Sequence, residues 1–98
     1  MKLNNRQTRH LKALAHSLKP VVTVGQRGLT DNVHEEIQLA LARHELIKVK
    51  IPAGPREGKD AICDEIASAS KSTRIALTGR TLILFKQKSP DKTRITLP

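Results

Sequence analysis

Aromatic residues are almost absent from this 98-residue chain, because Phe85 is the only one and there is no Trp or Tyr. Proteins that bind single-stranded nucleic acid by base stacking need several aromatic side chains on one surface. The composition therefore argues against that binding mode. Hydrophobic residues still make up 38% of the chain, so we expect a packed core of Leu, Ile, Val and Ala.

Cysteine is nearly absent as well. Cys63 is the only one, so no disulfide can form within the chain, which fits a reducing compartment. The first residues lack the apolar core of a signal peptide, and no apolar run is long enough to span a bilayer. We expect a cytoplasmic protein that does not associate with a membrane.

Sequence patterns for catalysis and metal binding are missing too. Residues Gly54–Asp60 are similar to a phosphate-binding P-loop, but the glycine spacing is one residue short and Asp60 stands where Ser or Thr would hold magnesium. His34–Gln38 begins like a zinc-protease helix, yet Gln38 replaces the second His. No metal-ligand set or acid–base pair emerges. We expect no enzyme activity, cofactor, metal or small-molecule substrate.

Positive charge is what the chain has in excess. Lys and Arg number 18 against 9 Asp and Glu, for a formal net charge of +9 and an isoelectric point near 10.3. This imbalance favours a polyanionic partner, with nucleic acid ahead of an anionic membrane. The first predicted helix has no acidic residue, although solvated helix faces usually mix the two signs. An anionic partner and an ordinary solvated surface explain this helix about equally well.

Hydrophobic periodicity predicts helices from Asn4 or Asn5 to about Leu18, from Thr30 or Asp31 to about His44, and from about Glu57 to Ser70. The predicted strands are Val21–Val24, Leu46–Ile51, Thr73–Thr78 and Thr81–Lys86. The expected buried stripes are Leu11, Leu14, Ala15 and Leu18 on the first helix, Leu29, Val33, Ile37, Ala40, Leu41 and His44 on the second, and Ile62, Cys63, Ile66 and Ala69 on the third.

The order of these elements predicts the sheet. A strand–helix–strand unit makes a right-handed crossover with parallel strands, whereas Gly79-Arg80 is typical of a tight hairpin turn. We therefore predict an α/β fold of the two-layer α+β type, with the order α-β-α-β-α-β-β and a four-stranded mixed sheet. The last strand is apolar on both sides and should be central or covered. Lys48 and Lys50 alternate with apolar residues, so one sheet face should be at least partly open.

The length allows one domain. We assign residues 1–88 to it and residues 89–98 to a polar, basic C-terminal tail with little order, in which Arg94–Leu97 could add a short edge strand.

The loop Gly25–Gly28 joins the first strand to the second helix. Glycines accept positive φ and allow another molecule close to the backbone, while a helix start offers unpaired N–H groups to an anion. Arg27 adds a forked donor suited to phosphate. Asp31, Glu35 and Glu36 would compete with phosphate, so a clamp would depend on the loop N–H groups and Arg27. Taken alone, Gly-x-x-Gly is more simply explained as a tight turn.

Three ordered segments resemble the CRM domain (chloroplast RNA splicing and ribosome maturation), namely Val21–Thr30, His44–Lys50 and Gly79–Lys86. The resemblance covers about residues 5–88 and is to the stand-alone bacterial members of the family. Phe85 stands where the family often has Tyr. The resemblance implies a fold similar to the C-terminal domain of translation initiation factor three. It also implies RNA binding with the Gly25–Gly28 loop against the RNA backbone, as in KH domains, and a role in maturation of large-ribosomal-subunit precursors.

We therefore expect a non-catalytic, monomeric RNA-binding protein whose partner is ribosomal RNA of large-subunit precursor particles. The residues expected to contact RNA are Gly25, Gln26, Arg27, Gly28, Arg9, Lys12, Lys19, Lys48, Lys50 and Arg80. The cations of the first helix and of the residues that follow it contribute if that helix packs beside the loop. The placement of Lys48, Lys50 and Arg80 depends on the sheet.

Three alternatives stay open. A DNA-binding or architectural protein would carry the same charge, and only competition between matched RNA and DNA separates it, through the 2′-OH. A membrane-surface protein would use the first helix, although its apolar stripe lacks Trp and Phe. An enzyme acting on RNA would have to assemble residues that are distant in sequence.

Overall fold

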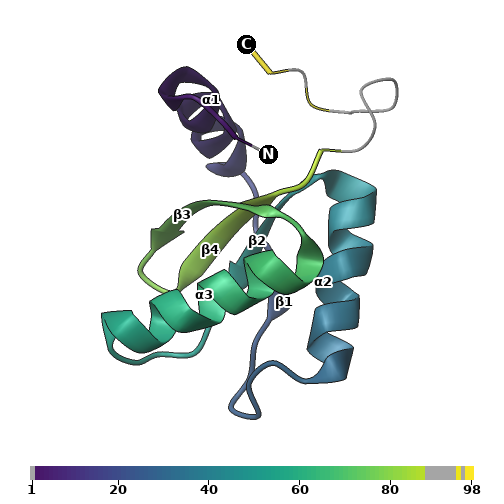
Figure 1. The fold of residues 1–98 in the computed structure, drawn as a ribbon, viewed down its shortest axis with the longest axis vertical. Helices are drawn as coiled ribbons and strands as arrows, with labels where there is room; N and C mark the ends of the chain where they lie inside the picture. Colours follow the sequence, from purple (N-terminus) through teal and green to yellow (C-terminus); the bar gives the residue numbers. More distant parts are fainter. Residues whose placement is uncertain (1, 88–94, 96) are drawn as a thin grey trace.

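The computed structural model describes residues 2–87, 95 and 97–98. It contains three helices and four strands in the predicted order (Figure 1). The elements are α1 (Asn5–Ala15), β1 (Pro20–Thr23), α2 (Asp31–His44), β2 (Leu46–Lys50), α3 (Arg56–Ser70), β3 (Thr73–Thr78) and β4 (Thr81–Phe85).

The strands form one mixed sheet in the order β1-β2-β4-β3. β1 pairs with β2 in parallel, and β4 pairs antiparallel with both β2 and β3. The predicted parallel pairing across the crossover and the predicted hairpin are therefore confirmed. β4 lies between two strands and between helices on both faces, which explains why its residues from Leu82 to Phe85 are all buried.

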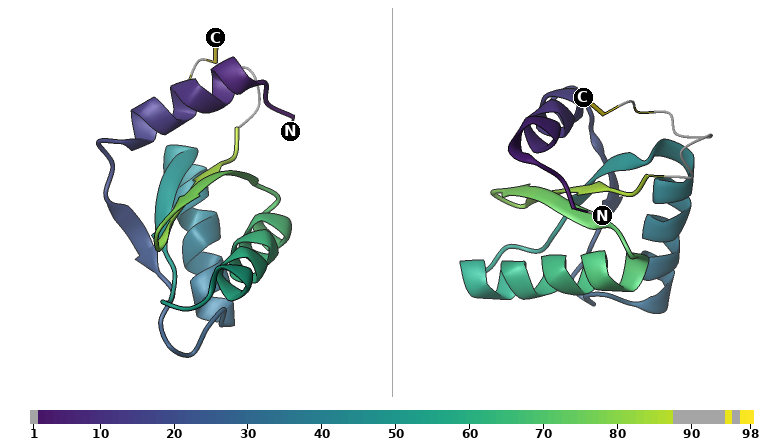
Figure 2. Two further views of the ribbon diagram at one scale, coloured as in Figure 1. Left: turned by 90° about the vertical axis from the view of Figure 1, so that its left-hand side faces the viewer. Right: turned by 45° about the horizontal axis from the view of Figure 1, so that its top comes forward.

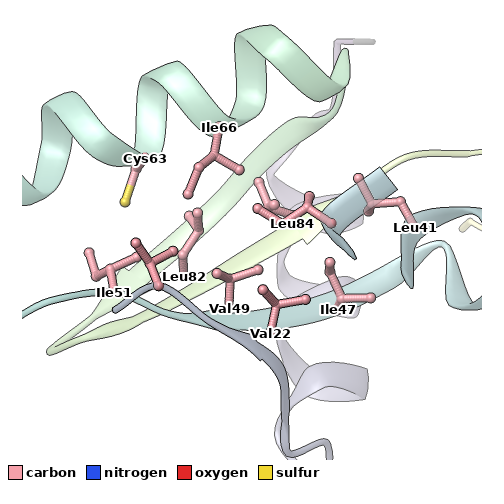
Figure 3. Packing of buried hydrophobic residues seen from close by; sticks show 11 residues of the cluster. Val22, Leu41, Ile47, Val49, Ile51, Cys63, Ile66, Leu82 and Leu84 are labelled. Carbon is pink, nitrogen blue, oxygen red and sulfur yellow. The ribbon is translucent and has the colours of Figure 1, made fainter. Parts of the chain in front are cut away.

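The main core lies between the sheet and the pair α2 and α3. Alternate residues of β2 point into it, because side chains of a strand alternate between faces. Ile47, Val49 and Ile51 are buried there, as predicted. Figure 3 shows them packed with aliphatic residues of the helices and the neighbouring strands. The cluster comprises Val22, Val24, Ile37, Leu41, Ile47, Val49, Ile51, Cys63, Ile66, Leu82 and Leu84.

Helix α1 lies across the opposite face of the sheet (Figure 2). A smaller core beneath it contains Leu11, Ala15, Leu46, Ile83 and Phe85. The predicted α+β fold with a four-stranded mixed sheet is confirmed, and α1 adds a partial third layer to it. The helix leaves the rest of that face open, as the lysines of β2 indicated.

The first helix is shorter than predicted. Asn4 caps it through a reciprocal pair of hydrogen bonds, accepting from the Gln7 N–H at 2.8 Å and donating its own N–H to the Gln7 side chain at 3.1 Å. The helix ends at Ala15, so the residues after it leave the helical period. The predicted burial of Leu14 and Leu18 was wrong, because only the line through Leu11 and Ala15 faces the sheet.

Two further burial predictions were wrong. His44 is exposed at the end of α2, and Ala69 is exposed on α3. Ser70 is buried in its place, and its hydroxyl donates to the Ile66 carbonyl at 2.7 Å. A serine can satisfy its own polar group in this way, which the apolar pattern could not indicate.

The end of the chain returns to α1. Ile95 and Leu97 pack against the smaller core, and the Ile95 N–H donates to the Glu45 carboxylate at 3.2 Å. The Gln7 side chain donates to the Pro98 carbonyl at 3.3 Å. Arg94 and Thr96 of the predicted strand, and residues 89–93 of the predicted tail, lie outside the described residues, so the strand stays a prediction. None of the described helices has the length and apolarity needed to cross a bilayer.

Candidate nucleic-acid interface

The Gly25–Gly28 loop is a closed turn between β1 and α2. The Gly28 N–H donates to the Gly25 carbonyl at 3.0 Å, and the Thr30 N–H donates to the Gly28 carbonyl at 3.1 Å. Gly28 has a φ of +74°, whereas Gly25 has no positive φ, so only the second glycine is required by the backbone. A Cβ added at either glycine would meet nothing within 4 Å. The space beside both glycines is therefore open to another molecule.

The start of α2 offers an anion little. The Thr30 hydroxyl caps the helix by accepting from the Val33 N–H at 3.2 Å, and Asp31 stands in the first turn. The loop itself carries the exposed side chains of Gln26 and Arg27. Arg27 has neither a hydrogen bond nor an ion pair within the described chain. An anion at this end of the molecule would meet an uncommitted guanidinium.

Lys50 and Arg80 lie at the same end of the sheet as the loop. The Val24 N–H, next to Gly25, donates to the Lys50 carbonyl at 2.8 Å, and the Ile51 N–H donates to the Arg80 carbonyl at 2.8 Å. Both cationic side chains are exposed overall. The Arg80 Nε also donates to the Ile51 carbonyl at 3.0 Å, which holds this guanidinium beside the end of β2.

Helix α1 does not pack beside the loop. Its contacts are with β2, β3 and β4, and it lies at one end of the molecule while the loop lies at the other (Figures 1 and 2). The cations of α1 and of the residues after it were expected to contribute to the RNA site only if α1 packs beside the loop. That condition is not met. Arg9 is exposed on α1 and Lys19 is exposed after it, and neither shares a compact site with the loop.

A separate hollow lies beside α1, between this helix and the open sheet face. Its volume is about 350 Å³, and its lining includes Lys12, His16 and Lys48. The other lining residues are Thr78, Thr81 and Ile83. Thr81 pairs with Lys50, so the hollow extends along the open sheet face toward the end that carries the loop. The Lys48 ammonium donates to the Leu18 carbonyl at 3.1 Å, which fixes this lysine between α1 and the sheet.

His16, Thr78 and Thr81 also line this hollow, but they were not among the residues predicted from the sequence to contact RNA. His16 lies four residues after Lys12 and so on the same side of the segment, a signal that the sequence carried. The two threonines are distant in sequence from α1, and only the sheet register brings them there.

The exposed acidic side chains of the described residues are confined to one layer, whereas basic side chains lie in both. Residues 2–30, which form α1, β1 and the loop, contain no Asp or Glu. The described acidic residues other than the buried Glu45 lie on α2 and α3, and these are Asp31, Glu35, Glu36, Glu57, Asp60, Asp64 and Glu65. The face formed by α1 and the open sheet is therefore positive, which favours a polyanion.

The ion pairs of the described residues belong to the helical layer of α2 and α3. Arg74 of β3 bonds to Asp60 and Asp64, and the hydrogen bond from Arg74 lowers the pKa of Asp60 below its usual range. Arg56 adds a contact of 3.3 Å to Asp60, and His34 lies 3.8 Å from Glu65. Arg74 is thus paired within the protein, whereas the cations of α1 have no ion pair among the described residues.

Within the described ranges, no group of three or more His, Cys, Asp or Glu side chains is placed to hold a metal ion. Cys63 is buried in the main core, and its burial raises the pKa of the thiol.

Comparison with known families adds to this geometry. The sequence model of the CRS1/YhbY (CRM) domain matches residues 3–86. The chain belongs to this family. The match contains every helix and strand of the fold, together with the Gly25–Gly28 loop and the cationic sheet face.

Relatives of this CRM domain carry consistent names. The chain is 41% identical over 96 residues to a Haemophilus influenzae protein named RNA-binding protein, covering 98% of the chain and 95% of that protein. It is 37% identical to a Pseudomonas aeruginosa protein named "probable RNA-binding protein", covering 94% of the chain and 89% of that protein. A solved structure from Staphylococcus aureus, of a candidate RNA-binding protein, superimposes with a TM-score of 0.84 at 27% identity, covering 99% of the chain and 100% of that protein.

Proposed function

We propose that this CRM protein binds RNA without catalysing a reaction. Its RNA is ribosomal RNA of large-subunit precursors, and it acts as a monomer in the cytoplasm to assist their maturation. The observation that carries the proposal is the confinement of the exposed acids to the layer of α2 and α3, because the opposite face, with cations and no exposed carboxylate among the described residues, gains most from phosphates. Three relatives are named RNA-binding protein or probable RNA-binding protein, which supports the same partner.

The RNA backbone would meet the protein at two places. The Gly25–Gly28 loop offers open space and Arg27 at one end, with Lys50 and Arg80 nearby. The hollow with Lys12 and Lys48 offers a second contact beside α1. The molecule measures 37 Å along its longest axis, so an RNA that reaches both places presents several phosphates. Such contacts position a protein but do not read sequence, so RNA shape would select the site.

Affinity measurements on purified protein test the RNA contact. The ligands are transcripts of structured large-subunit ribosomal RNA and DNA of the same sequence and length, because the 2′-OH separates the two partners. Arg27→Ala alters the loop, and the double variant Lys12→Ala/Lys48→Ala alters the hollow. Arg43→Ala, an exposed cation of α2 outside both places, is the matched control.

We expect RNA to bind more tightly than DNA, and both test variants to weaken binding more than the control does. Equal affinities for the control and test variants would remove the loop and the hollow from the interface. Tighter binding to DNA would favour the architectural alternative.

The ribosomal part of the proposal needs a separate test. Cell extract is sedimented on sucrose gradients at low and moderate salt, and the protein is detected by blotting. We expect it with large-subunit precursors at low salt and at the top of the gradient at higher salt. Protein that stays at the top under both conditions would refute the association with precursors while leaving RNA binding itself to the affinity measurements.

A further inference from the structure

Exposed hydrophobic side chains gather around the edge strand β1. The large hydrophobic residues exposed among the described residues are Leu14 at 41%, Leu18 at 38%, Val21 at 51% and Leu39 at 57%. Single exposed leucines are ordinary, but a contiguous apolar surface indicates a binding site. All four of these side chains line one of two adjoining hollows.

The two hollows flank β1, and together we call them the β1 groove. The first, of about 450 Å³, lies toward α1 and is lined by Leu14, Leu18, Lys19, Val21, His44, Leu46, Ile47 and Ile95. The second, of about 350 Å³, lies toward α2 and is lined by Val21, Val22, Glu36, Leu39, Ala40, Arg43 and His44. Because they share Val21 and His44, they form one continuous surface across the strand.

The floor of the β1 groove has an open main-chain edge. β1 is the outermost strand on its side of the sheet, with β2 as its neighbour in the described structure. Alternate residues of a parallel strand bond to the neighbour, and Val24 bonds to β2. The N–H and C=O of Thr23 therefore face the open side, beside the exposed Val21. Such an edge is a template for an added strand.

We propose that the β1 groove binds an extended, acidic and apolar segment of a partner protein, which adds to the sheet beside β1. Side chains of an added strand alternate between its faces, so successive residues would enter the hollow toward α1 and the hollow toward α2. Main-chain bonds to the edge supply affinity, and the two hollows supply side-chain selectivity.

Charge selects the partner. Lys19 and Arg43 border the β1 groove against a single acid, Glu36. An acidic segment complements this rim. A second copy of the chain is disfavoured, because each copy carries a net charge of +9. The groove is lined mainly by aliphatic side chains, unlike the hollow with Lys12 and Lys48, so the inference stands independently of the proposed RNA contact.

The test is an NMR titration of the full chain with synthetic peptides. The probe is an eight-residue peptide of alternating Val and Glu with blocked ends. One control peptide has Lys in place of Glu, and the other has the same composition with all Val before all Glu. We expect saturable shifts of the Val21 and Thr23 amides and of the Leu14, Leu18 and Leu39 methyl groups with the probe, and at least tenfold weaker binding of both controls.

Two variants locate the binding. Val21→Glu places a carboxylate on the floor of the β1 groove, and we expect it to weaken binding of the probe peptide at least tenfold. Ala69→Glu, which adds the same charge at an exposed position of α3, is the matched control and should bind as the unaltered chain does. Both sites are exposed, so both variants should fold, which the amide spectrum checks directly.

Several outcomes would overturn the inference. These are the absence of saturable shifts, equal binding of all three peptides, or equal effects of the two variants. A dimer in sedimentation equilibrium that Val21→Glu abolishes would assign the groove to a second copy. Binding to phosphatidylglycerol vesicles that Val21→Glu abolishes would assign it to a membrane. Movement of the same methyl groups on addition of an RNA oligonucleotide would assign it to RNA.

Discussion

Gly28 donates its backbone N–H to the carbonyl oxygen of Gly25 over 3.0 Å, so the two glycines close the turn that joins β1 to α2. Their backbone conformations differ, because of the two only Gly28 has a positive φ. The two positions therefore separate two roles that a glycine can have, which are to permit a left-handed conformation and to leave space for a ligand.

Gly28→Ala should destabilise the protein by about 1–2 kcal/mol, the cost of a left-handed residue that carries a Cβ. The loss comes from the backbone and not from crowding, since the added Cβ would meet nothing within 4 Å. Gly25→Ala is the control and should change the free energy of unfolding little. Urea denaturation measures both variants, and equal losses would show that φ is not the cause.

Arg27→Ala should weaken RNA binding while changing the free energy of unfolding by less than about 0.5 kcal/mol, as expected of an exposed side chain that has no partner among the described residues. If Arg27 neutralises one phosphate, the slope of log affinity against log salt should fall by roughly 0.7–0.9. Titrations at four salt concentrations give the slope. A weaker affinity with an unchanged slope would mean that Arg27 contacts the RNA without pairing with a phosphate.

Glu45→Ala should lower the free energy of unfolding by about 1–3 kcal/mol, the usual cost of leaving buried hydrogen-bonding groups without a partner. Glu45 is fully buried, and its carboxylate accepts from the Ile95 N–H at 3.2 Å. Glu35→Ala, an exposed acid of α2, controls for the loss of one negative charge. A loss no greater than that of Glu35→Ala would show that the bond to the chain end contributes nothing to stability.

Acidic pH should lower the free energy of unfolding, in part through protonation of Asp60. Arg74 lowers the pKa of this carboxyl in the folded state, so its contribution is present above the pKa of the unfolded chain and is lost as the pH falls through the lower, folded value. Asp60→Asn should therefore reduce stability at pH about 7 and lose less on acidification than the unaltered chain. Thermal melting at neutral and strongly acid pH measures the difference.

For this acid effect, Glu57→Gln on the same helix is the control, because Glu57 is exposed and has no ion pair among the described residues. Parallel melting curves for Asp60→Asn and the unaltered chain across the pH range would exclude a contribution from the Arg74 contact.

Cys63 should be inert toward thiol reagents in the folded protein. Burial raises the pKa of its thiol, and the reactive thiolate is therefore scarce as well as inaccessible. Iodoacetamide labelling followed by mass spectrometry should be slow in buffer and rapid in concentrated urea. Rapid labelling without denaturant would mean that α3 opens readily from the sheet.

Local patterns were enough for most of the fold. The caps at Asn4 and Thr30, the alternation along β2 and the turn at Gly79 each depend on neighbours within a few residues, and the sequence carries that information directly. The end of α1 was misjudged because its apolar spacing continues to Leu18, although the sheet beneath covers only part of it. Ser70 was missed because its hydroxyl finds a partner within its own helix.

The candidate interface was predictable only residue by residue. The sequence predicts that Arg27 lies on a glycine-containing loop. It does not predict that this loop lies far from α1. The groove beside β1 could not be predicted at all, because Leu14, Val21 and Leu39 belong to three different elements, and each is unremarkable within its own.

The sequence by itself determined the elements, their order, the parallel crossover and the excess of positive charge, because these depend on local spacing, on chain chirality and on composition. The tertiary structure decided where the charge lies. Helix α1 crosses the sheet face opposite to α2 and α3, so the acid-free α1 and the acidic helices lie on opposite faces of the sheet. Packing of apolar faces makes that choice, and the confinement of the exposed acids of the described residues to one side is its consequence.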